Sequence, residues 1–424
     1  MLFVDIVRYV LDLLLFLKIK MRQSEEFMKN YSRVIGGIGI VAGTTIGASM
    51  IALPIASSRL GFCSSVALML CVWLLMFLSG LVIMKLALHF DETHSIVGIA
   101  DKVLGKPAKI ITFASMVLLF YSLLAAYVAG ASDILTNRFF DVSHVAKNIV
   151  SVAVVLILGF LVYRSTKLMD YGNRVMMFLK AFCFVAMLMM TAPYISAHYL
   201  LQGGVRSLIN TTDISLYAIA IPIFFTSFGF HGSIITIVKY LKRDKNAIFT
   251  SISLGSFIPV LIYIAWLVVT IGVLPNYGTY SFENVVLSGG NVGVLIAQLG
   301  SYINMQIFEE FISYFAVFAI LTSFLGVAAG FFDVLLEMMS KKNAIFCTLI
   351  PPLFVSIIIP QAFMTALAFA SIALCIIAII IPSIAMIKLE RKKDKPLYML
   401  SLYFSLFFGI SIIAIAIIDF IFIL

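Results

Sequence analysis

Residues 36–54 read GGIGIVAGTTIGASMIALP, an apolar stretch of about the length that crosses a lipid bilayer. Its centre is rich in glycine, which costs roughly 1 kcal/mol against alanine inside a helix. Lipid offers no water to replace a lost backbone hydrogen bond, so a helix that breaks in the membrane must face protein or a polar cavity. In secondary transporters, such broken helices hold the substrate near the middle of the bilayer. The stretch therefore predicts a solute carrier.

The composition of the chain is that of a membrane protein. Of its 424 residues, 62% are hydrophobic and 12% are charged, and its mean hydropathy is +1.13, whereas soluble domains carry about 25% charged residues. A bilayer core of about 30 Å needs about 20 residues of helix. We therefore predict an all-α polytopic membrane protein. Its eleven expected spans are 34–57, 60–84, 109–135, 147–163, 174–198, 212–240, 246–273, 308–338, 344–360, 362–388 and 397–423.

Basic residues are unevenly distributed over the loops between these spans. If the N-terminus lies in the cytoplasm, all but four of the 29 Lys and Arg residues fall on the inner side. Lys180 is counted among them, as the last charge of an inner segment at 164–180. By the positive-inside rule, this asymmetry predicts a cytoplasmic N-terminus and an external C-terminus. Inner loops beside anionic lipid headgroups then explain the net charge of +9 without a nucleic-acid partner.

The N-terminal residues 1–33 are expected to form a cytoplasmic tail or a short interfacial helix. Charged residues interrupt the apolar run 2–17 and no small-residue cleavage site follows it, so a signal peptide is not expected. A translational start at Met21 or Met28 is an alternative. The five cysteines are scattered through apolar stretches without metal or redox spacing, so we expect buried small side chains and neither a metal nor a cofactor.

The sixth span repeats the peculiarity of the first. Its residues 214–233 place Pro222, Gly229 and Gly232 in what should be the middle of a helix. Corresponding interruptions in two halves of a transporter are the best pointer in a sequence to a binding site near the middle of the membrane.

A plainer interpretation of the glycines in the first span is close helix packing. Gly39, Gly43 and Gly47 are spaced by four, which is the small-xxx-small pattern of helices that cross closely. The adjacent Thr44 and Thr45, together with the second interrupted span, favour an unwound helix instead.

Spans one and six begin two consecutive blocks of five helices. Since five is odd, the second block enters the membrane from the opposite side, which makes the two blocks an inverted repeat. We predict a first repeat at 34–200, a second at 210–389 and an eleventh transmembrane helix at 396–424.

Motifs in spans one, three, six and eight carry a family resemblance. They are Gly43-Thr44-Thr45-Ile46-Gly47-Ala48 followed by Ala52-Leu53-Pro54 and Gly61-Phe62, Ala125-Ala126-Tyr127 through Gly130 and Ser132-Asp133, Ser227-Phe228-Gly229-Phe230-His231-Gly232, and Thr322-Ser323-Phe324-Leu325-Gly326. Together they resemble the hydroxy and aromatic amino acid permease family, in particular the bacterial tyrosine- and tryptophan-specific transport proteins. The likeness runs from Met28 onward, and Ser49 departs from it because the family usually has glycine there.

This resemblance implies the LeuT-like, five-plus-five fold of the APC superfamily and a place in the bacterial cytoplasmic (inner) membrane. It also implies uptake of tyrosine, tryptophan or both by proton symport, with alternating access at broken helices one and six. Thr322 and Ser323 fall where related folds bind sodium, and we interpret them as a vestigial or proton-modified cation site.

A zwitterionic amino acid suits the two ends of a broken helix. Free amides at Gly47 and Ala48 present partial positive charge to its carboxylate. The carbonyls expected to receive its ammonium are those of Ala42, Gly43, Ser227 and Phe228. Aromatic side chains near the second break can stack on an aromatic substrate. The complete predicted substrate site is Ala42, Gly43, Thr44, Thr45, Gly47, Ala48, Tyr127, Ser227, Phe228, Gly229 and Phe230.

Two further residues are candidates for proton coupling beside Thr322 and Ser323. His231 titrates in a range that suits a relay, although a structural histidine bonded to a carbonyl freed by the break is the alternative. Asp333 lies toward the end of span eight, where a gate and a salt bridge to a loop lysine are both plausible.

Other classes of protein fit the sequence less well. A membrane enzyme would need acidic and histidine side chains clustered at one boundary, and the sequence offers no such cluster. A channel would line its path with repeated polar or charged rings. The open alternatives are a permease for another small amino acid, such as serine or threonine, a sodium-coupled carrier and a channel. The sequence does not predict the oligomeric state.

Overall fold

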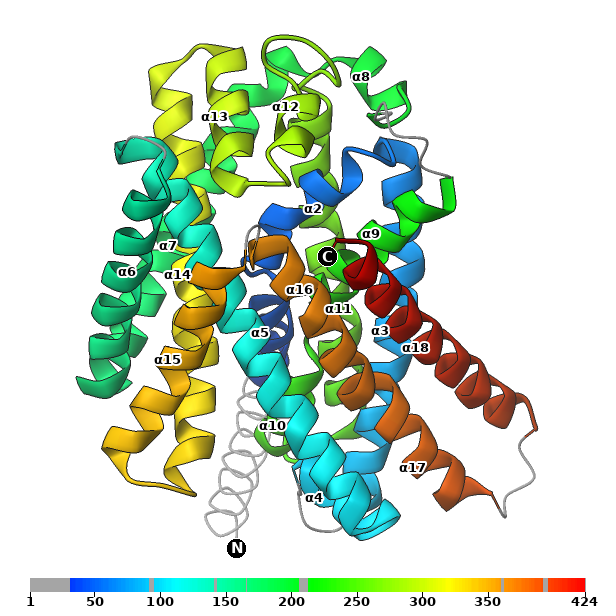
Figure 1. The fold of residues 1–424 in the computed structure, drawn as a ribbon. Coiled ribbons are helices and arrows are strands. Elements are labelled where there is room, and N and C mark those ends of the chain that lie inside the picture. Colours follow the sequence, from blue (N-terminus) through cyan, green and yellow to red (C-terminus); the bar gives the residue numbers. More distant parts are fainter. Residues whose placement is uncertain are drawn as a thin grey trace, which may run out of the picture.

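The structure is a computed structural model that describes residues 31–90, 95–140, 143–164, 166–205, 213–359, 362–391 and 396–423. The regular structure in these ranges is entirely helical (Figure 1). Ten helical spans are long and apolar enough to cross a membrane, or eleven if one bent helix pair counts as a span. The predicted all-α polytopic membrane protein is therefore confirmed. The elements of the ten spans are α3 (Phe62–His89), α5 (Lys106–Phe139), α6 (His144–Arg164), α7 (Thr166–Thr191), α9 (Asp213–Ser227) with α10 (His231–Tyr240), α11 (Lys245–Ile271), α14 (Gln306–Leu336), α15 (Lys341–Ile358), α16 (Ala362–Cys375) with α17 (Ile381–Glu390), and α18 (Pro396–Ile423).

The first predicted span is the bent pair. Helix Tyr31–Thr45 and α2 (Ser49–Ser57) meet at 55°, and residues 46–48 between them are not helical. A Cβ atom added at Gly39 would meet nothing within 4 Å. The row of glycines at 39, 43 and 47 therefore does not pack closely against another helix along its whole length. The chain unwinds here instead, as the second interpretation of these glycines predicts.

The sixth predicted span is interrupted as well. α9 ends at Ser227 and α10 begins at His231, and residues 228–230 between them are not helical. Pro222 lies inside α9 without ending it, so the interruption follows the glycine and not the proline. Two of the long apolar segments are therefore broken within the described residues, at the places where the sequence predicts it.

α5 lies at the centre of the bundle, in contact with α6, α14, α15 and α16. A Cβ atom added at Gly130 would lie 2.8 Å from the ring of Phe363 on α16, so the glycine permits this close packing. α16 continues through a π-helical turn, Ile376–Ile380, into α17. The centre of the protein is thus a continuous apolar core around α5.

Short helices lie at the two ends of the bundle. α8 (Ala197–Leu201), α12 (Phe282–Leu287) and α13 (Val292–Ile303) lie at one end, and α4 (Ile96–Leu104) lies at the other (Figure 1). Of the N-terminal tail or interfacial helix predicted at 1–33, residues 1–30 lie outside the described residues.

Ionic contacts tie the long helices together at both ends. At the end with α13, Arg138 of α5 pairs with Glu309 of α14 at 2.8 Å. At the end with α4, Lys85 of α3 pairs with the buried Glu390 of α17 at 3.3 Å. The first pair is partly exposed, whereas the carboxylate of the second is almost fully enclosed.

Candidate functional site

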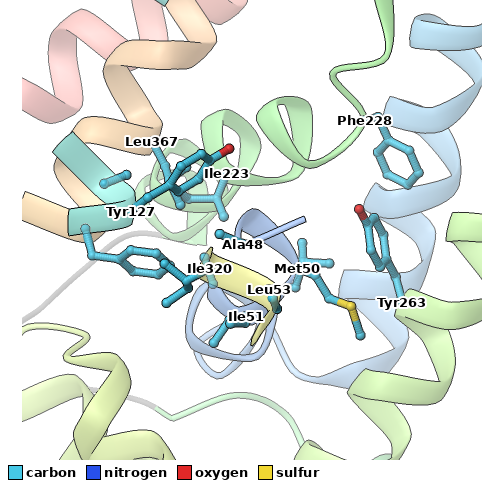
Figure 2. Packing of buried hydrophobic residues seen from close by; sticks show 14 of the residues in the cluster. Ala48, Met50, Ile51, Leu53, Tyr127, Ile223, Phe228, Tyr263, Ile320 and Leu367 are labelled. Carbon is cyan, nitrogen blue, oxygen red and sulfur yellow. The ribbon is translucent and has the colours of Figure 1, made fainter. Parts of the chain in front are cut away.

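The two interrupted spans meet inside the protein. α2 packs against α9, and the Ser227 hydroxyl lies 3.4 Å from the Ser49 carbonyl. The same hydroxyl donates a shorter bond, of 2.8 Å, to the Ile223 carbonyl within its own helix. Figure 2 shows Ala48 and the α2 side chains beside Ile223 of α9 and Tyr127 of α5. The unwound residues of both spans therefore share one region of the core.

Tyr263 of α11 connects the two breaks. Its hydroxyl lies 2.7 Å from the Thr45 carbonyl and 2.9 Å from the Ser227 carbonyl, and these are its two acceptors. Thr45 and Ser227 are the last residues of their helices. Tyr263 is fully buried, and its ring centroid lies 5.4 Å from that of Phe228 (Figure 2). Two helix C-termini, each with partial negative charge, thus converge on one phenol.

A lysine also reaches the first break. The Lys180 amine of α7 lies 3.1 Å from the Ile46 carbonyl, and the residue is 6% exposed. No carboxylate of the described residues pairs with it. The assignment of Lys180 to an inner loop is therefore wrong, because helix α7 carries it into the bundle. The apolar residues on both sides of it, Met176–Leu179 and Ala181–Met187, were the signal in the sequence.

The start of α2 is held by α14. The Ala48 amide donates a hydrogen bond of 2.9 Å to the Ser323 hydroxyl. A Cβ atom added at Gly47 would lie 2.7 Å from the same hydroxyl, so glycine allows this approach. The Gly47 amide donates to no residue that the structure describes, and it lies at the positive end of α2. Of the two amides predicted to bind a carboxylate, Gly47 has a vacant donor and Ala48 is engaged by Ser323.

The carbonyls left by the breaks differ in part from those predicted. The Ala42 carbonyl accepts the Ile46 amide at 2.8 Å, and the Phe228 carbonyl accepts the Phe230 amide at 3.0 Å. Both predicted acceptors are thus already used by the backbone. The reason at the first break is that the helix continues to Thr45, about one turn beyond Ala42. The acceptors that face Tyr263 are those of Thr45 and Ser227, and only Ser227 was predicted for this role.

The threonine hydroxyls at the first break are used within their own helix. Thr44 and Thr45 donate to the Val41 carbonyl at 2.9 and 2.7 Å. Thr44 is exposed, whereas Thr45 is buried. Gly43 is half-buried, and a Cβ atom added there would make an ordinary contact of 3.9 Å with Met177 of α7. These three residues therefore form the last turn of the helix before the break, and both threonine hydroxyl hydrogens are paired within it.

Aromatic side chains surround the breaks. Tyr127 of α5 lies beside Ile223 and Leu367 (Figure 2), and its hydroxyl donates to none of the described residues. Phe228 and Phe230 are fully buried on either side of Gly229. Phe228 and Phe230 are therefore packed into the protein, while Tyr127 keeps a hydroxyl hydrogen for another partner.

His231 lies away from both freed carbonyls. Its Nε2 atom is 2.7 Å from the Ser79 hydroxyl and 3.1 Å from the Met76 carbonyl, both on α3. Phe230 stacks on the imidazole ring. The predicted bond to a carbonyl of the break is therefore wrong, because the first turn of α10 points the side chain toward α3.

The two remaining coupling candidates lie apart on α14. The Thr322 hydroxyl donates to the Phe318 carbonyl at 2.8 Å, one turn earlier. Asp333 is exposed and pairs with no lysine of the described residues. Of the four candidates, Ser323 alone contacts the break. Tyr263 and Lys180, which were not predicted as site residues, contact the first break. His231, Thr322 and Asp333 form no hydrogen bond with it in the part of the chain that the structure describes.

Comparison with known proteins gives consistent results over nearly the whole chain. The model of the tryptophan/tyrosine permease family matches residues 30–423. The tryptophan-specific transport protein of Haemophilus influenzae is 32% identical over 381 residues, which cover 85% of this chain and 88% of that protein. Tyrosine-specific transport system 1 of the same organism is 29% identical over 366 residues, 83% of this chain and 87% of the relative. The low affinity tryptophan permease of Escherichia coli K12 is 26% identical over 366 residues, 84% of this chain and 87% of the relative.

Proposed function

The chain belongs to the tryptophan/tyrosine permease family, and from this premise we propose that it imports tyrosine or tryptophan together with a proton. Its family and its relatives are transport proteins and not enzymes, and it is a multi-pass membrane protein. The observation that carries the proposal is the meeting of two broken helices around Tyr263, Lys180 and Ser323.

The proposed architecture is the five-plus-five inverted repeat, with repeats at 34–200 and 210–389 and α18 as an added eleventh helix. The positions of the two breaks support it, because each falls in the first span of its block. We place the protein in the bacterial inner membrane with the α13 end outside, since the basic loops then lie inside.

The proposed binding mode uses backbone groups for the charged ends of the substrate. The Gly47 amide at the start of α2 would bind the carboxylate, and the carbonyls of Thr45 and Ser227 would bind the ammonium. Backbone dipoles avoid burying an unpaired ion when the site is empty, which is costly in a membrane interior. The aromatic ring would lie against Tyr127 and its aliphatic neighbours, where the free hydroxyl supplies one polar contact.

Lys180 is the proposed proton-coupling group. Its amine contacts the Ile46 carbonyl, which is the first group of the unwound segment. A proton on this amine adds a positive charge at the C-terminal end of helix Tyr31–Thr45, and its loss leaves a neutral amine. A change of protonation therefore changes the electrostatics of the break directly. This titratable amine at the break supports a proton over sodium as the coupling ion.

The expected activity is concentrative uptake. One positive charge that moves inward gains about 2.3 kcal/mol per 100 mV, which at about 1.36 kcal/mol per tenfold supports a roughly 50-fold gradient of a zwitterion. Proteoliposomes with an inward proton gradient should therefore concentrate tyrosine or tryptophan, and a protonophore should abolish the accumulation. Accumulation that follows a sodium gradient alone would contradict proton symport.

Competition identifies the substrate class. Unlabelled tyrosine, tryptophan, phenylalanine and serine are added in turn to an uptake assay with one labelled aromatic amino acid. The aromatic compounds are expected to compete, because Tyr127 and its neighbours offer an apolar surface for a ring. Strong competition by serine alone would favour the alternative permease for small amino acids.

Replacing His231 by glutamine is expected to lower the stability of the protein without uncoupling it. The side chain bonds Ser79 and Met76 of α3 and touches neither carbonyl of the breaks, so its loss weakens the contact between α10 and α3. The melting temperature in detergent and the protonophore-sensitive accumulation ratio check this expectation. A stable variant that no longer responds to the proton gradient would instead assign the coupling proton to His231.

A further inference from the structure

Two helices of this protein end on a single neutral hydrogen-bond donor. The carbonyls of Thr45 and Ser227 lie 2.7 and 2.9 Å from the Tyr263 hydroxyl, and both belong to the last residue of a helix. A helix C-terminus carries a partial charge of about −0.5. These two termini together carry close to a full negative charge. The phenol between them brings no charge, and the amine of Lys180 contacts the Ile46 carbonyl rather than either of the two terminal carbonyls.

The Tyr263 hydroxyl also supplies too few hydrogens for its two acceptors. A phenol has one O–H, whereas an ammonium group has three N–H donors and a positive charge. The other side-chain donors nearby bond different carbonyls: Lys180 reaches that of Ile46, and the Ser227 hydroxyl bonds that of Ile223. Within the described part of the chain, no other side chain donates to the carbonyl of Thr45 or Ser227.

We propose that the Tyr263 hydroxyl holds the place of the substrate ammonium while the carrier is empty. It links the two half-helices in the absence of substrate and yields the carbonyls of Thr45 and Ser227 when an amino acid binds. Tyr263 is thus a positioning residue that lets the empty protein return across the membrane. This inference rests on the proposed function, because it requires an amino acid substrate.

The consequence is a specific split between two modes of transport. In net uptake, each cycle includes the return of the empty carrier, whereas exchange of external for internal amino acid proceeds with the site always filled. Without the phenol, the empty state leaves two buried acceptors unpaired, and the filled state does not. Loss of the hydroxyl should therefore slow net uptake and spare exchange.

The test compares Tyr263→Phe with wild type in proteoliposomes. Phenylalanine keeps the ring contact with Phe228 and removes only the hydroxyl. Net proton-driven uptake is expected to fall by about tenfold or more, and exchange with preloaded unlabelled substrate to stay within about twofold of wild type. Tyr121→Phe is the matched control, since the Tyr121 hydroxyl also donates to a carbonyl of another helix, that of Cys347 at 3.0 Å. We expect this control to change neither the exchange rate nor the ratio of exchange to net uptake.

Other outcomes overturn the inference. An equal loss of net uptake and exchange in Tyr263→Phe, or no loss of either, would give Tyr263 a purely structural role or none. The same split in Tyr121→Phe would do so as well. If wild type transports no aromatic amino acid at all, the proposed function fails before Tyr263 is tested, so the two failures are distinguishable.

A second measurement covers the case in which Tyr263→Phe does not fold. Wild-type protein labelled with ¹³C-tyrosine is mixed with tryptophan or with its ammonium-free analogue indole-3-propionate, and infrared difference spectra are recorded in the C–O stretch of tyrosine. Tryptophan is expected to produce a tyrosine band that the analogue lacks, because only an ammonium displaces the phenol. Identical spectra for the two compounds would overturn the inference.

Discussion

Replacing Lys180 by methionine is expected to abolish the concentrative uptake of tyrosine or tryptophan. Methionine has nearly the length of lysine but cannot carry a proton, so the charge beside the Ile46 carbonyl is lost. Accumulation in proteoliposomes should fall from the roughly 50-fold ratio that 100 mV supports to about one, because the charge movement no longer drives the cycle. Exchange should be impaired less than net accumulation, since it needs no net proton movement.

Two controls accompany Lys180→Met. Lys109→Met removes a largely exposed lysine that pairs with Asp101 at 2.9 Å, and it should leave accumulation unchanged. Lys180→Arg keeps a charge that does not release its proton under ordinary conditions, and it should also fail to accumulate substrate. Wild-type accumulation by Lys180→Met, still sensitive to a protonophore, would exclude Lys180 as the coupling group.

Replacing Gly47 by leucine is expected to eliminate substrate binding. Even a Cβ atom at this position would lie 2.7 Å from the Ser323 hydroxyl, so a leucine must push this hydroxyl away and break its hydrogen bond with the Ala48 amide. It would also cover the free Gly47 amide. We expect uptake at low substrate concentration to fall by about 100-fold or more, which corresponds to about 3 kcal/mol of lost binding free energy.

The matched control for Gly47→Leu is Gly39→Ala, two turns earlier in the same span. A Cβ atom added at Gly39 meets nothing within 4 Å, and alanine is a better helix former there. Gly39→Ala should therefore fold and transport normally. Size-exclusion chromatography in detergent shows whether each variant is folded. Folded Gly47→Leu protein with normal uptake would exclude a carboxylate site at the start of α2.

The sequence predicted the two breaks because glycine in the middle of an apolar span has a local physical cost. It placed the first break within a few residues of its position at 46–48. It placed the second only between Pro222 and Gly232, and the structure has that break at 228–230. It could not predict which carbonyls remain free, because the helix continues through Thr45 by local hydrogen bonds that pattern alone does not reveal.

The partners of the breaks were harder to predict than the breaks themselves. Tyr263 lies far from both Thr45 and Ser227 in sequence, and only the packing of α11 brings its hydroxyl to them. Lys180 was missed for a different reason, since it follows a run of inner-loop charges and was counted with them. His231 was predicted to bond a carbonyl of the break because it follows the break in sequence. The direction of α10 instead places its side chain against α3.

The groups exposed at the two breaks are main-chain atoms, the Gly47 amide and the carbonyls of Thr45 and Ser227. Every sequence that keeps these bends also keeps these main-chain groups, because a substitution changes only the side chain. In the proposed binding mode, substrate choice is then set by the side chains beside the breaks, such as Tyr127, Ile223 and Leu367. A redesign toward a different amino acid should begin with those three positions and leave the bends untouched.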